Sequence, residues 1–511
     1  MSAELLVRRF AQVTETPNAI ARLRRFLIDL AVSGRLGDDR DKPIRIGWPY
    51  APLGDLVDLR YGKGLAQADR TPEGPVAVYG SNGIVARTHT ALADAPSIIV
   101  GRKGSAGALR MADEPSWTTD VAYYIEPPPS LNIRFLFFAL QSLRLESLGK
   151  GVKPGLSRSD AYPLLLPQPP LTDQRRIVAK VDELMALCDE LEAAQTHREA
   201  RRDRLRATSL RNLVAPDKSK DYARFFLRHS ARMITKPEHV AGVRQAILDL
   251  AVRGRLVAQD PEDEPFAPPG DADTTSSSRR TRDSRGLTTA EIPPFDIPLE
   301  WHWASLGRVS TIVRGITFAA ADKSKVPLPG HIACLRSGNV QAGVTWSNLL
   351  YVPRSVVRSG DQLVREDDIL ISIANSYALV GKCAIAVGVP FEAAYGAFLA
   401  AIRVCDDDPR YVAMTLTASY SGEAFRRGSA QTTNIANITF GYIRGHPIPL
   451  PPLAEQHRIV AQVDELMAVC DELERSLARE QTERGRLLEA LLRDALEDAL
   501  PARELEPLGA R

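Results

Sequence analysis

A glycine-rich loop with two cations is the part of this sequence that most resembles a chemical site. It reads Gly101-Arg-Lys-Gly-Ser-Ala-Gly107 and follows a short apolar run. Backbone amides in such a loop, together with Arg102 and Lys103, can hold phosphate oxygens. The loop opens no obvious helix with dinucleotide spacing, so a plain turn after a strand remains the alternative.

Patterns that would indicate catalysis are absent from the sequence. The 8 histidines stand singly, the 5 cysteines form no Cys-x-x-Cys pair, and no Gly-x-x-x-x-Gly-Lys-Ser/Thr phosphate loop occurs. Ile292-Pro-Pro-Phe295 differs from the Asn-Pro-Pro-Phe of amino-methyltransferases, because Ile stands where an Asn would hydrogen-bond the target amine. Residues 1–12 lack a signal-peptide core. We therefore expect a cytoplasmic binding protein without a metal or cofactor site.

The charge is balanced overall and unevenly distributed. The chain has 65 Lys and Arg against 63 Asp and Glu, a net charge of +2. Residues 301–450 carry 14 basic and 10 acidic side chains, whereas residues 451–500 carry 6 and 12. A nucleic-acid partner would therefore have to bind local basic loops, because no positive field covers the whole molecule.

The elements that would position such loops occur twice. Residues 169–192 and 451–474 are identical at 19 of 24 positions, and residues 28–36 recur as 248–256. Between these repeats lie two regions that begin with tryptophan and share little sequence. We therefore predict a tandem duplication in which similar helices flank two divergent domains.

Each tryptophan-started domain has mixed α/β character. Apolar runs such as Ser97–Gly101 and Ile369–Ile373 predict strands, and residues 133–148 and 410–425 have helical spacing. The predicted order is an N-terminal helical segment (1–46), a first domain (47–170), a central long helix (171–215), a second helical segment (216–259), a flexible linker (260–294), a second domain (295–450) and a C-terminal long helix with its tail (451–511).

Both long helices carry a heptad seam, which is typical of coiled coils. The seam consists of Ile177, Val181, Leu184, Cys188 and Leu191 in the first copy, and of Ile459, Val463, Leu466, Cys470 and Leu473 in the second. Neither helix can bury its seam alone, so we expect the two copies to pack on each other. A pseudo-twofold tandem repeat would make this coiled coil antiparallel. The predicted fold class is α+β, with two mixed α/β domains joined by two long helices.

The doubled motifs resemble a known family. The Pro-Pro-Leu-x-x-Gln-x-x-Ile-Val-x-x-Val-Asp-Glu-Leu helix and the Asp-Leu-Ala-Val-x-Gly-x-Leu segment are similar to the conserved helices of type I restriction–modification specificity subunits. Tyr79–Gly83 and Gly101–Ser105 look like loops of that family's target recognition domains.

This resemblance implies a non-catalytic subunit that reads a bipartite, asymmetric site in double-stranded DNA, with one half-site for each domain. It also implies two adenine-N6 methyltransferase (modification) subunits and restriction/translocase subunits as partners. Those partners would bind S-adenosylmethionine and ATP with Mg²⁺, and this chain would bind no cofactor. A coiled-coil assembly scaffold without DNA specificity and a self-contained methyltransferase or nuclease are the alternatives.

Base recognition requires loop side chains that can donate or accept hydrogen bonds in a groove. The candidate DNA-contacting residues in the first domain are Lys63, Ser81, Asn82, Arg102, Lys103, Ser105, Lys150, Lys153 and Arg158. Those in the second domain are Arg314, Arg336, Ser337, Asn339, Asn375, Ser376, Tyr377, Arg426, Arg427, Gln431 and Asn434. At each position a solvated turn residue is the alternative.

The basic loop at residues 149–158 supplies a first testable prediction. Replacing Lys150 and Lys153 together by alanine should weaken DNA binding and flatten its dependence on salt, because fewer counterions are released on binding. A titration at several salt concentrations measures both effects. Unchanged affinity with an unchanged salt slope would contradict the choice of these lysines.

Overall fold

The computed structural model describes residues 18–34, 48–94, 96–149, 155–215, 219–264, 294–431 and 435–497. The chain forms two compact units, which are residues 1–201 with 479–511 and residues 202–478. Most of the predicted linker, 260–294, and the end of the predicted tail lie outside the described residues. Among the described helices, none is long and apolar enough to cross a membrane.

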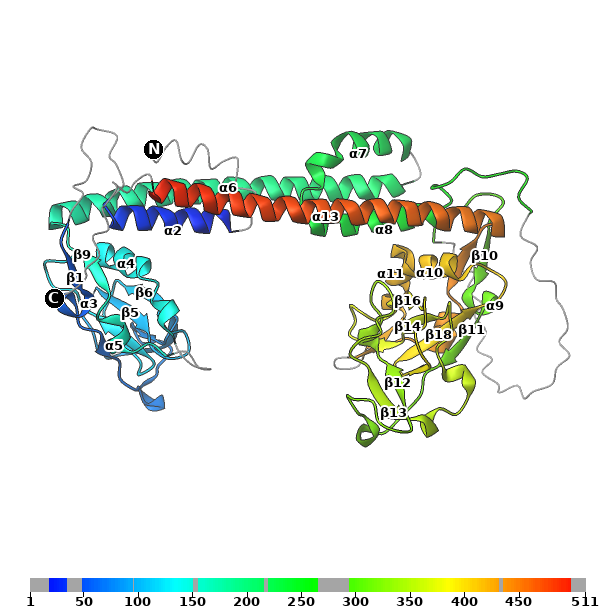
Figure 1. Cartoon of the computed structure of the whole chain (residues 1–511), viewed down its shortest axis with the longest axis horizontal. Coiled ribbons are helices and arrows are strands. Elements are labelled where there is room, and N and C mark those ends of the chain that lie inside the picture. Colours follow the sequence, from blue (N-terminus) through cyan, green and yellow to red (C-terminus); the bar gives the residue numbers. More distant parts are fainter. Residues whose placement is uncertain are drawn as a thin grey trace, which may run out of the picture. The chain divides into compact units, whose positions relative to one another are not determined.

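The first unit contains a helix, a domain of short strands and part of each long helix (Figure 1). Its helices are α2 (Ala19–Val32), α3 (Leu53–Leu56), α4 (Ile133–Ser142) and α5 (Arg158–Ala161). Its strands are β1 (Tyr50–Pro52), β2 (Arg60–Tyr61), β3 (Val76–Tyr79), β4 (Ile84–Thr88), β5 (Ser97–Gly101), β6 (Leu109–Ala112), β7 (Ser116–Thr118), β8 (Ala122–Ile125) and β9 (Leu165–Pro167).

Two sheets and a short strand pair build the first domain. One sheet has the order β2-β8-β5-β6, the other has the order β4-β3-β7, and β1 pairs with β9. Strand β5 is buried throughout, since Ile98 and Val100 pack with α4 and Ile99 packs on a second cluster. The pairing of β1 with β9 closes the domain next to the long helix that follows. Strand β9 begins the proline-rich exit of the domain, residues 165–170, which leads directly into that helix.

The second unit contains the remaining elements. Its helices are α7 (Ser219–Met233), α8 (Val240–Ala251), α9 (Leu306–Val309), α10 (Pro409–Thr417), α11 (Ser419–Arg427) and α12 (Phe440–Arg444). Its strands are β10 (His302–Ser305), β11 (Ser310–Arg314), β12 (His331–Leu335), β13 (Leu350–Pro353), β14 (Ile369–Ser372), β15 (Ala374–Asn375), β16 (Cys383–Ile385), β17 (Ala393–Tyr395), β18 (Leu399–Val404), β19 (Ala430–Gln431), β20 (Ala436–Asn437) and β21 (Pro447–Leu450).

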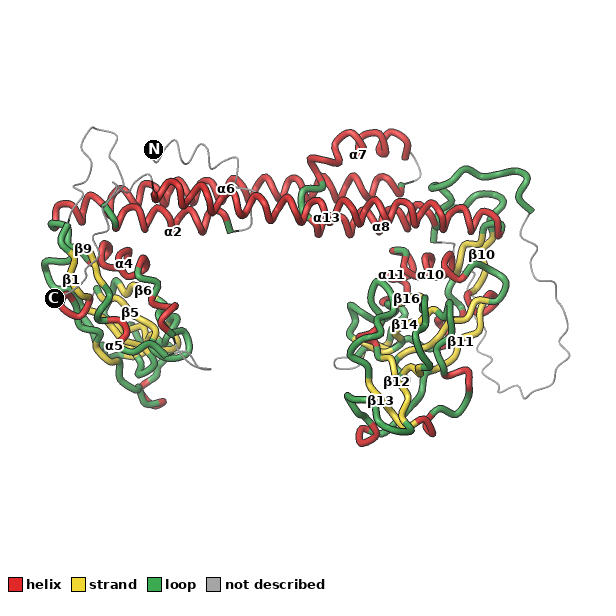
Figure 2. Tube along the Cα trace, in the orientation of Figure 1, coloured by secondary structure: helices red, strands yellow, loops and turns green. Residues whose placement is uncertain are grey.

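The second domain repeats the topology of the first despite its different sequence. Its sheets β11-β18-β14-β16 and β13-β12-β17 correspond to the two sheets of the first domain, and the pair β10-β21 corresponds to β1-β9. A third sheet, β15-β20-β19, is added in the second domain. Figure 2 shows α10 and α11 on the side of this domain that faces the long helix, with strands and loops beyond them.

The long helices α6 (Leu171–Val214) and α13 (Leu453–Glu497) confirm the predicted helical repeats. In the first unit, the seam at the start of α6 packs with α2 and with Leu488 near the end of α13. In the second unit, the seam at the start of α13 packs with α8 and with Leu213 near the end of α6. The two long helices therefore run antiparallel, and each seam is completed by the far end of the other long helix and by a short helix.

Two predicted helices are interrupted. Residues 133–148 form α4 and a separate 3₁₀ turn, because Arg144 adopts the left-handed conformation at φ 52°. Residues 410–425 form two helices, because Ala418 is extended between α10 and α11. The carboxylate of Asp249 accepts hydrogen bonds from the backbone N–H and hydroxyl of Ser419, which satisfies the new helix start.

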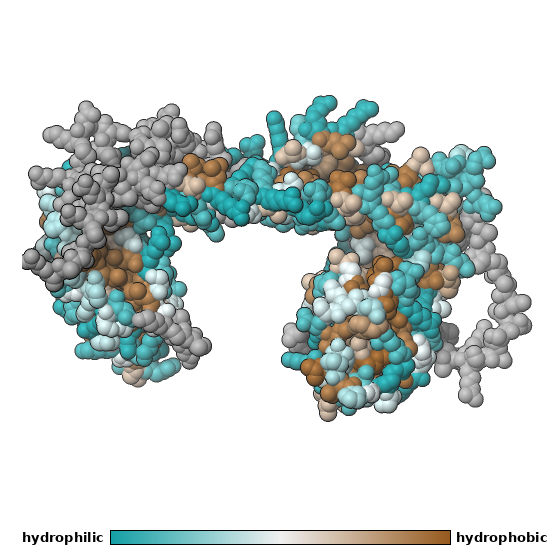
Figure 3. Space-filling model, viewed as in Figure 1, coloured by the Kyte–Doolittle hydropathy of each residue, from teal (hydrophilic) through white to brown (hydrophobic). Residues whose placement is uncertain are grey.

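Helix α7 is amphipathic. Phe226 and Met233 are buried in the core of the second unit, whereas Leu227 is 73% exposed. Figure 3 shows hydrophobic surface over α7 among hydrophilic side chains.

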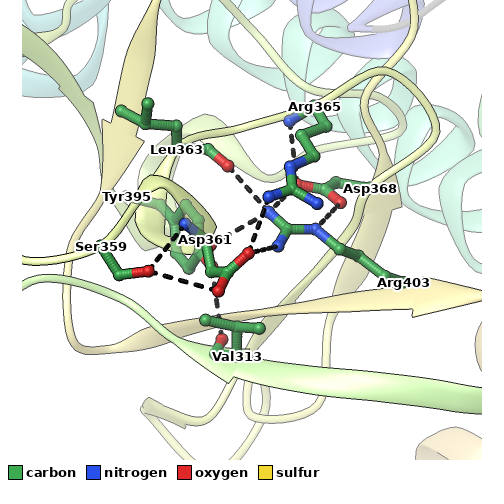
Figure 4. Close-up of polar contacts among 8 residues, drawn as sticks. All are labelled: Val313, Ser359, Asp361, Leu363, Arg365, Asp368, Tyr395 and Arg403. Carbon is green, nitrogen blue, oxygen red and sulfur yellow. Dashed lines mark hydrogen bonds and ion pairs between the residues drawn. The ribbon is translucent and has the colours of Figure 1, made fainter.

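A buried ion pair fixes the loop before β14 in the second domain (Figure 4). The Arg403 guanidinium donates to both carboxylate oxygens of Asp368, at 2.8 and 3.1 Å, and to the carbonyl oxygen of Leu363 at 2.8 Å. The Asp368 side chain is 1% exposed and that of Arg403 is 13% exposed. Asp361 joins the same group, and the Tyr395 hydroxyl donates to its carbonyl oxygen at 3.2 Å.

Removing one partner of this pair should destabilise the second domain strongly. We expect Asp368→Ala to lower the free energy of unfolding by about 3 kcal/mol, because it removes the buried counterion of Arg403 and leaves only the exposed Asp361 beside that charge. Arg354→Ala, which breaks an exposed pair with Glu392, should cost less than about 1 kcal/mol. Denaturant titration of the full chain compares the two variants. Equal effects would contradict a structural role for the buried pair.

Candidate nucleic-acid interface

In the first domain, the loops after β2, β3 and β5 meet at one place, and glycines permit the close approach. A Cβ atom on Gly101 would lie 2.0 Å from the Ser105 carbonyl oxygen and 2.5 Å from that of Ser81. A Cβ atom on Gly62 would lie 2.1 Å from the Thr119 carbonyl oxygen. No other residue fits at these crossings, so the glycines bring the loops carrying Lys63, Ser81 and Arg102 together.

Two lysines of this cluster project into solvent. Lys63 and Lys103 are exposed, and neither ammonium group has a charged partner among the described residues. The exposed Asn82 accepts a hydrogen bond from Arg110 at 2.9 Å, which orients its amide. Ser81 and Ser105 are half-buried in the same cluster. The arrangement offers two cations and several hydrogen-bonding groups to a ligand outside the domain.

Two predicted arginines stack on a tyrosine that the sequence interpretation missed. The Arg158 guanidinium carbon lies 4.1 Å from the centre of the Tyr61 ring, and that of Arg102 lies 4.9 Å from it. The Tyr61 side chain is 49% exposed and its ring centre is 5.0 Å from that of Tyr123. Burial and a hydrogen bond with Tyr61 raise the pKa of Tyr123. In the sequence, the only indication that Tyr61 belongs to this cluster is its position two residues before the candidate Lys63.

The corresponding strand ends of the second domain carry other side chains. Arg314 is exposed at the end of β11, and a Cβ atom on the following Gly315 would lie 2.3 Å from the Gly396 carbonyl oxygen. The Gly396 N–H donates to the carbonyl oxygen of Leu335 at 2.9 Å. This bond places the end of β12, and therefore Arg336, beside the same crossing. Arg336 is exposed and donates to the carbonyl oxygen of Asn348.

The added sheet presents a further group. Asn375 of β15 and Gln431 of β19 both pair with Ala436 of the central strand β20, so the two polar residues lie on opposite sides of that strand. Ser376 and Tyr377 are exposed directly after β15. Arg426 and Arg427 lie at the end of α11, where Arg427 is exposed. Three candidates lie outside the described residues, namely Lys150, Lys153 and Asn434.

Asn339 differs from the other candidates, because it serves the loop that carries them. It is 3% exposed, and its amide nitrogen donates to the carbonyl oxygens of Thr345 and Ser347 at 3.0 and 2.9 Å. Its side-chain oxygen accepts the backbone N–H of Arg336 at 2.9 Å. The side chain therefore positions Arg336 and Ser337 and is itself turned away from solvent.

The doubled motif of the long helices holds each domain in place. The Gln174 side-chain oxygen accepts the backbone N–H of Asn132 at 2.7 Å, just before α4. The equivalent Gln456 accepts the backbone N–H of Asp408 at 2.9 Å, just before α10. Both glutamines are buried, and each also donates to the proline-rich exit of its domain.

Carboxylates of the same motif bind arginines of neighbouring elements. Asp182 binds Arg134 of α4 with two hydrogen bonds of 2.5 and 2.6 Å. In the second copy, the equivalent Asp464 binds Arg410 of α10 at 2.7 Å. Asp189 and Glu192 bind Arg24 of α2. The equivalent residues of the second unit repeat this arrangement in the group Arg244, Asp471 and Glu474. The motif therefore orients both the domain and the short helix.

Two domains of one topology, each with cationic loops at its strand ends and each tied to a long helix, define a protein with duplicated candidate nucleic-acid-binding domains. The chain belongs to the type I restriction modification DNA specificity domain family, which matches residues 45–200 and 298–482. These ranges include both tryptophan-started domains and most of the repeated long-helix motifs.

Curated relatives carry the same description. The chain is 26% identical over 391 residues to the type I restriction enzyme EcoEI specificity subunit of Escherichia coli, covering 72% of this chain and 65% of that one. It is also 26% identical over 331 residues to the EcoAI specificity subunit of Escherichia coli, covering 60% and 54%. The matches thus span less than two thirds of the length of these relatives.

A solved structure shares the fold. A chain from work on complex assembly and conformational transition of the type I R-M system aligns with a TM-score of 0.50 and 19% identity. The alignment covers 88% of this chain and 97% of that chain. The predicted fold class, with two mixed α/β domains and paired long helices, is confirmed.

The contrasting roles of Asn339 and Ser376 can be separated by experiment. Asn339→Ala should lower the free energy of unfolding by about 2 kcal/mol, because it leaves buried carbonyl and N–H groups without partners. Ser376→Ala, at an exposed position, should leave stability unchanged within about 0.5 kcal/mol. Denaturant titration measures both. A neutral Asn339→Ala would show that the loop does not depend on this side chain.

Proposed function

We propose that this chain is the DNA-recognition subunit of a type I restriction–modification complex. Each tryptophan-started domain reads one half of a bipartite, asymmetric site in double-stranded DNA. The observation that carries the proposal is the pair of loop clusters, which occupy the same strand ends in both domains and carry different side chains. In the first domain Lys63 follows β2, and Arg102 and Lys103 follow β5. In the second domain Arg314 ends β11, the equivalent of β2, and Arg336 follows β12, the equivalent of β3.

Different side chains on one scaffold favour two different half-sites. Bases are distinguished by the donors and acceptors that face them in the major groove, so an arginine or serine at a given loop position selects different partners. The exposed lysines suit phosphate contacts, which supply affinity without sequence information. Because the net charge of the chain is only +2, much of the electrostatic affinity would come from partner subunits.

The chain itself would perform no chemistry. Its described residues contain no group of three metal-ligating side chains, and its sequence has neither a phosphate loop nor a glycine-rich S-adenosylmethionine turn. Two modification subunits would bind S-adenosylmethionine and methylate adenine N6, and restriction/translocase subunits would bind ATP and Mg²⁺. The paired long helices would set the gap between half-sites, since each helix is tied to one domain through a buried glutamine.

The methylated sites in the genome of an expression host test this proposal. The chain would be co-expressed with the modification subunits of its own system in a host that lacks DNA methylation. We expect one bipartite motif with a fixed gap and one N6-methyladenine on each strand. Replacing residues 301–450 by the equivalent domain of another family member should change one half of the motif only.

Two results would contradict the proposal. A stable complex that adds no methylation to DNA and shows no salt-dependent DNA binding would favour an assembly scaffold without DNA specificity. A domain replacement that changed both halves of the motif, or neither, would contradict the assignment of one half-site to each domain.

A further inference from the structure

The arginine and tyrosine stack in the first domain holds one guanidinium group in a fixed position. Arg102 lies 4.9 Å from the centre of the Tyr61 ring and 5.9 Å from that of Tyr123, and it donates to the Asp120 carbonyl oxygen at 2.8 Å. Its backbone N–H donates to the Val121 carbonyl oxygen, so the main chain at Arg102 is also fixed in place. Few rotamers remain for this side chain, and it loses little entropy on binding a ligand.

Most donors of this guanidinium remain available. Among the described residues, the Arg102 side chain makes one hydrogen bond, to the Asp120 carbonyl oxygen, and a guanidinium has five donors. Among the residues that the structure describes, no carboxylate pairs with Arg102, whereas Arg158 lies 3.6 Å from Asp58. A second cation on the same ring increases the local positive potential. The site therefore favours a ligand with acceptor atoms that lie in one plane.

The same position in the second domain is built differently. Tyr61 pairs with Tyr123 on strands β2 and β8, just before Gly62. The equivalent strands β11 and β18 pair Arg314 with Ala400, just before Gly315. The second domain thus places an exposed arginine where the first domain has the tyrosine that supports Arg102. Both domains present a guanidinium at this crossing, from different strands and with different support.

We propose that Arg102 is a specificity-determining residue that donates to a guanine base in the half-site of the first domain. Tyr61 is its positioning residue. Guanine offers the acceptors O6 and N7 in one plane in the major groove, which a fixed guanidinium matches with two hydrogen bonds. The neighbouring Lys103 is exposed and has no charged partner among the described residues, and it contacts phosphate instead. This inference rests on the proposed function, because it requires that the first domain reads DNA.

The methylation assay, carried out on the complete complex, tests the assignment with matched variants. Arg102→Gln should relax or change one base-pair position of the first half-site, with discrimination falling on the order of tenfold or more. The second half-site and the gap should stay the same. Tyr61→Leu should weaken discrimination at that same position, because the guanidinium is no longer held in place. Lys103→Gln should reduce methylation at all sites alike.

A charge-conserving variant and the salt dependence of binding distinguish a base contact from a phosphate contact. Arg102→Lys retains the charge and loses the planar donor pair, so it should lose discrimination while the salt dependence of binding stays that of the wild type. A methylation motif unchanged in Arg102→Gln would overturn the inference while leaving the proposed function intact. So would uniform loss at all sites with a lower salt slope, since that result indicates a phosphate contact. Absence of methylation with the wild-type chain would instead count against the proposed function.

Discussion

The candidate DNA-contacting loops owe their positions to a buried glutamine at the start of each long helix. Gln174 is 2% exposed and Gln456 is 0% exposed, and each bonds with both ends of its amide to the domain beside it. A buried amide with all its partners in fixed places specifies one arrangement, because leaving such groups unpaired costs about 1–3 kcal/mol each. The side-chain oxygens accept hydrogen bonds from the residues just before α4 and α10, and these two helices pack against the sheets. The orientation of each long helix therefore determines the orientation of the strands in its domain, and with it the positions of the loops at the strand ends.

The same requirement accounts for the polar half of the doubled motif. The acidic residues of the long helices look like a solvated face of a coiled coil when the sequence is considered alone. In the structure they bind arginines of other elements, as Asp182 binds Arg134 and Asp189 binds Arg24. Exposed ion pairs contribute little to stability, so these contacts matter for orientation more than for the free energy of folding. Both copies keep them because each copy must place one domain and one short helix in the same way.

Sequence alone predicted the features that depend on local periodicity and missed those that depend on distant partners. The two long helices, the strands β5 and β14 and the doubled order of elements follow from spacing and are present in the structure. The interruption of the helix at Ala418 depends on Asp249, which is far away in the chain. The burial of Asn339 and the stacking of Arg102 on Tyr61 depend on strand crossings that no single segment reveals. The general location of the candidate site was therefore predictable, whereas the division between contacting and positioning side chains was not.

The two copies have also diverged where the domain joins the helix. The indole N–H of Trp301 donates to the Glu455 carboxylate at 2.9 Å, whereas that of Trp48 is buried without an acceptor among the described residues. The residue equivalent to Glu455 is Asp173, which is one methylene shorter and lies 3.7 Å from Arg176. Gln259 also donates to Glu455, so the second junction carries a polar network that has no equivalent among the described residues of the first. Burial raises the pKa of Glu455 above its ordinary value, although the bonds from Trp301 and Gln259 oppose this shift. Duplication thus fixed the few contacts that orient each domain and left their surroundings free to differ. The proposed reading of two unlike half-sites would need this combination, because the scaffold must repeat while the loops must differ.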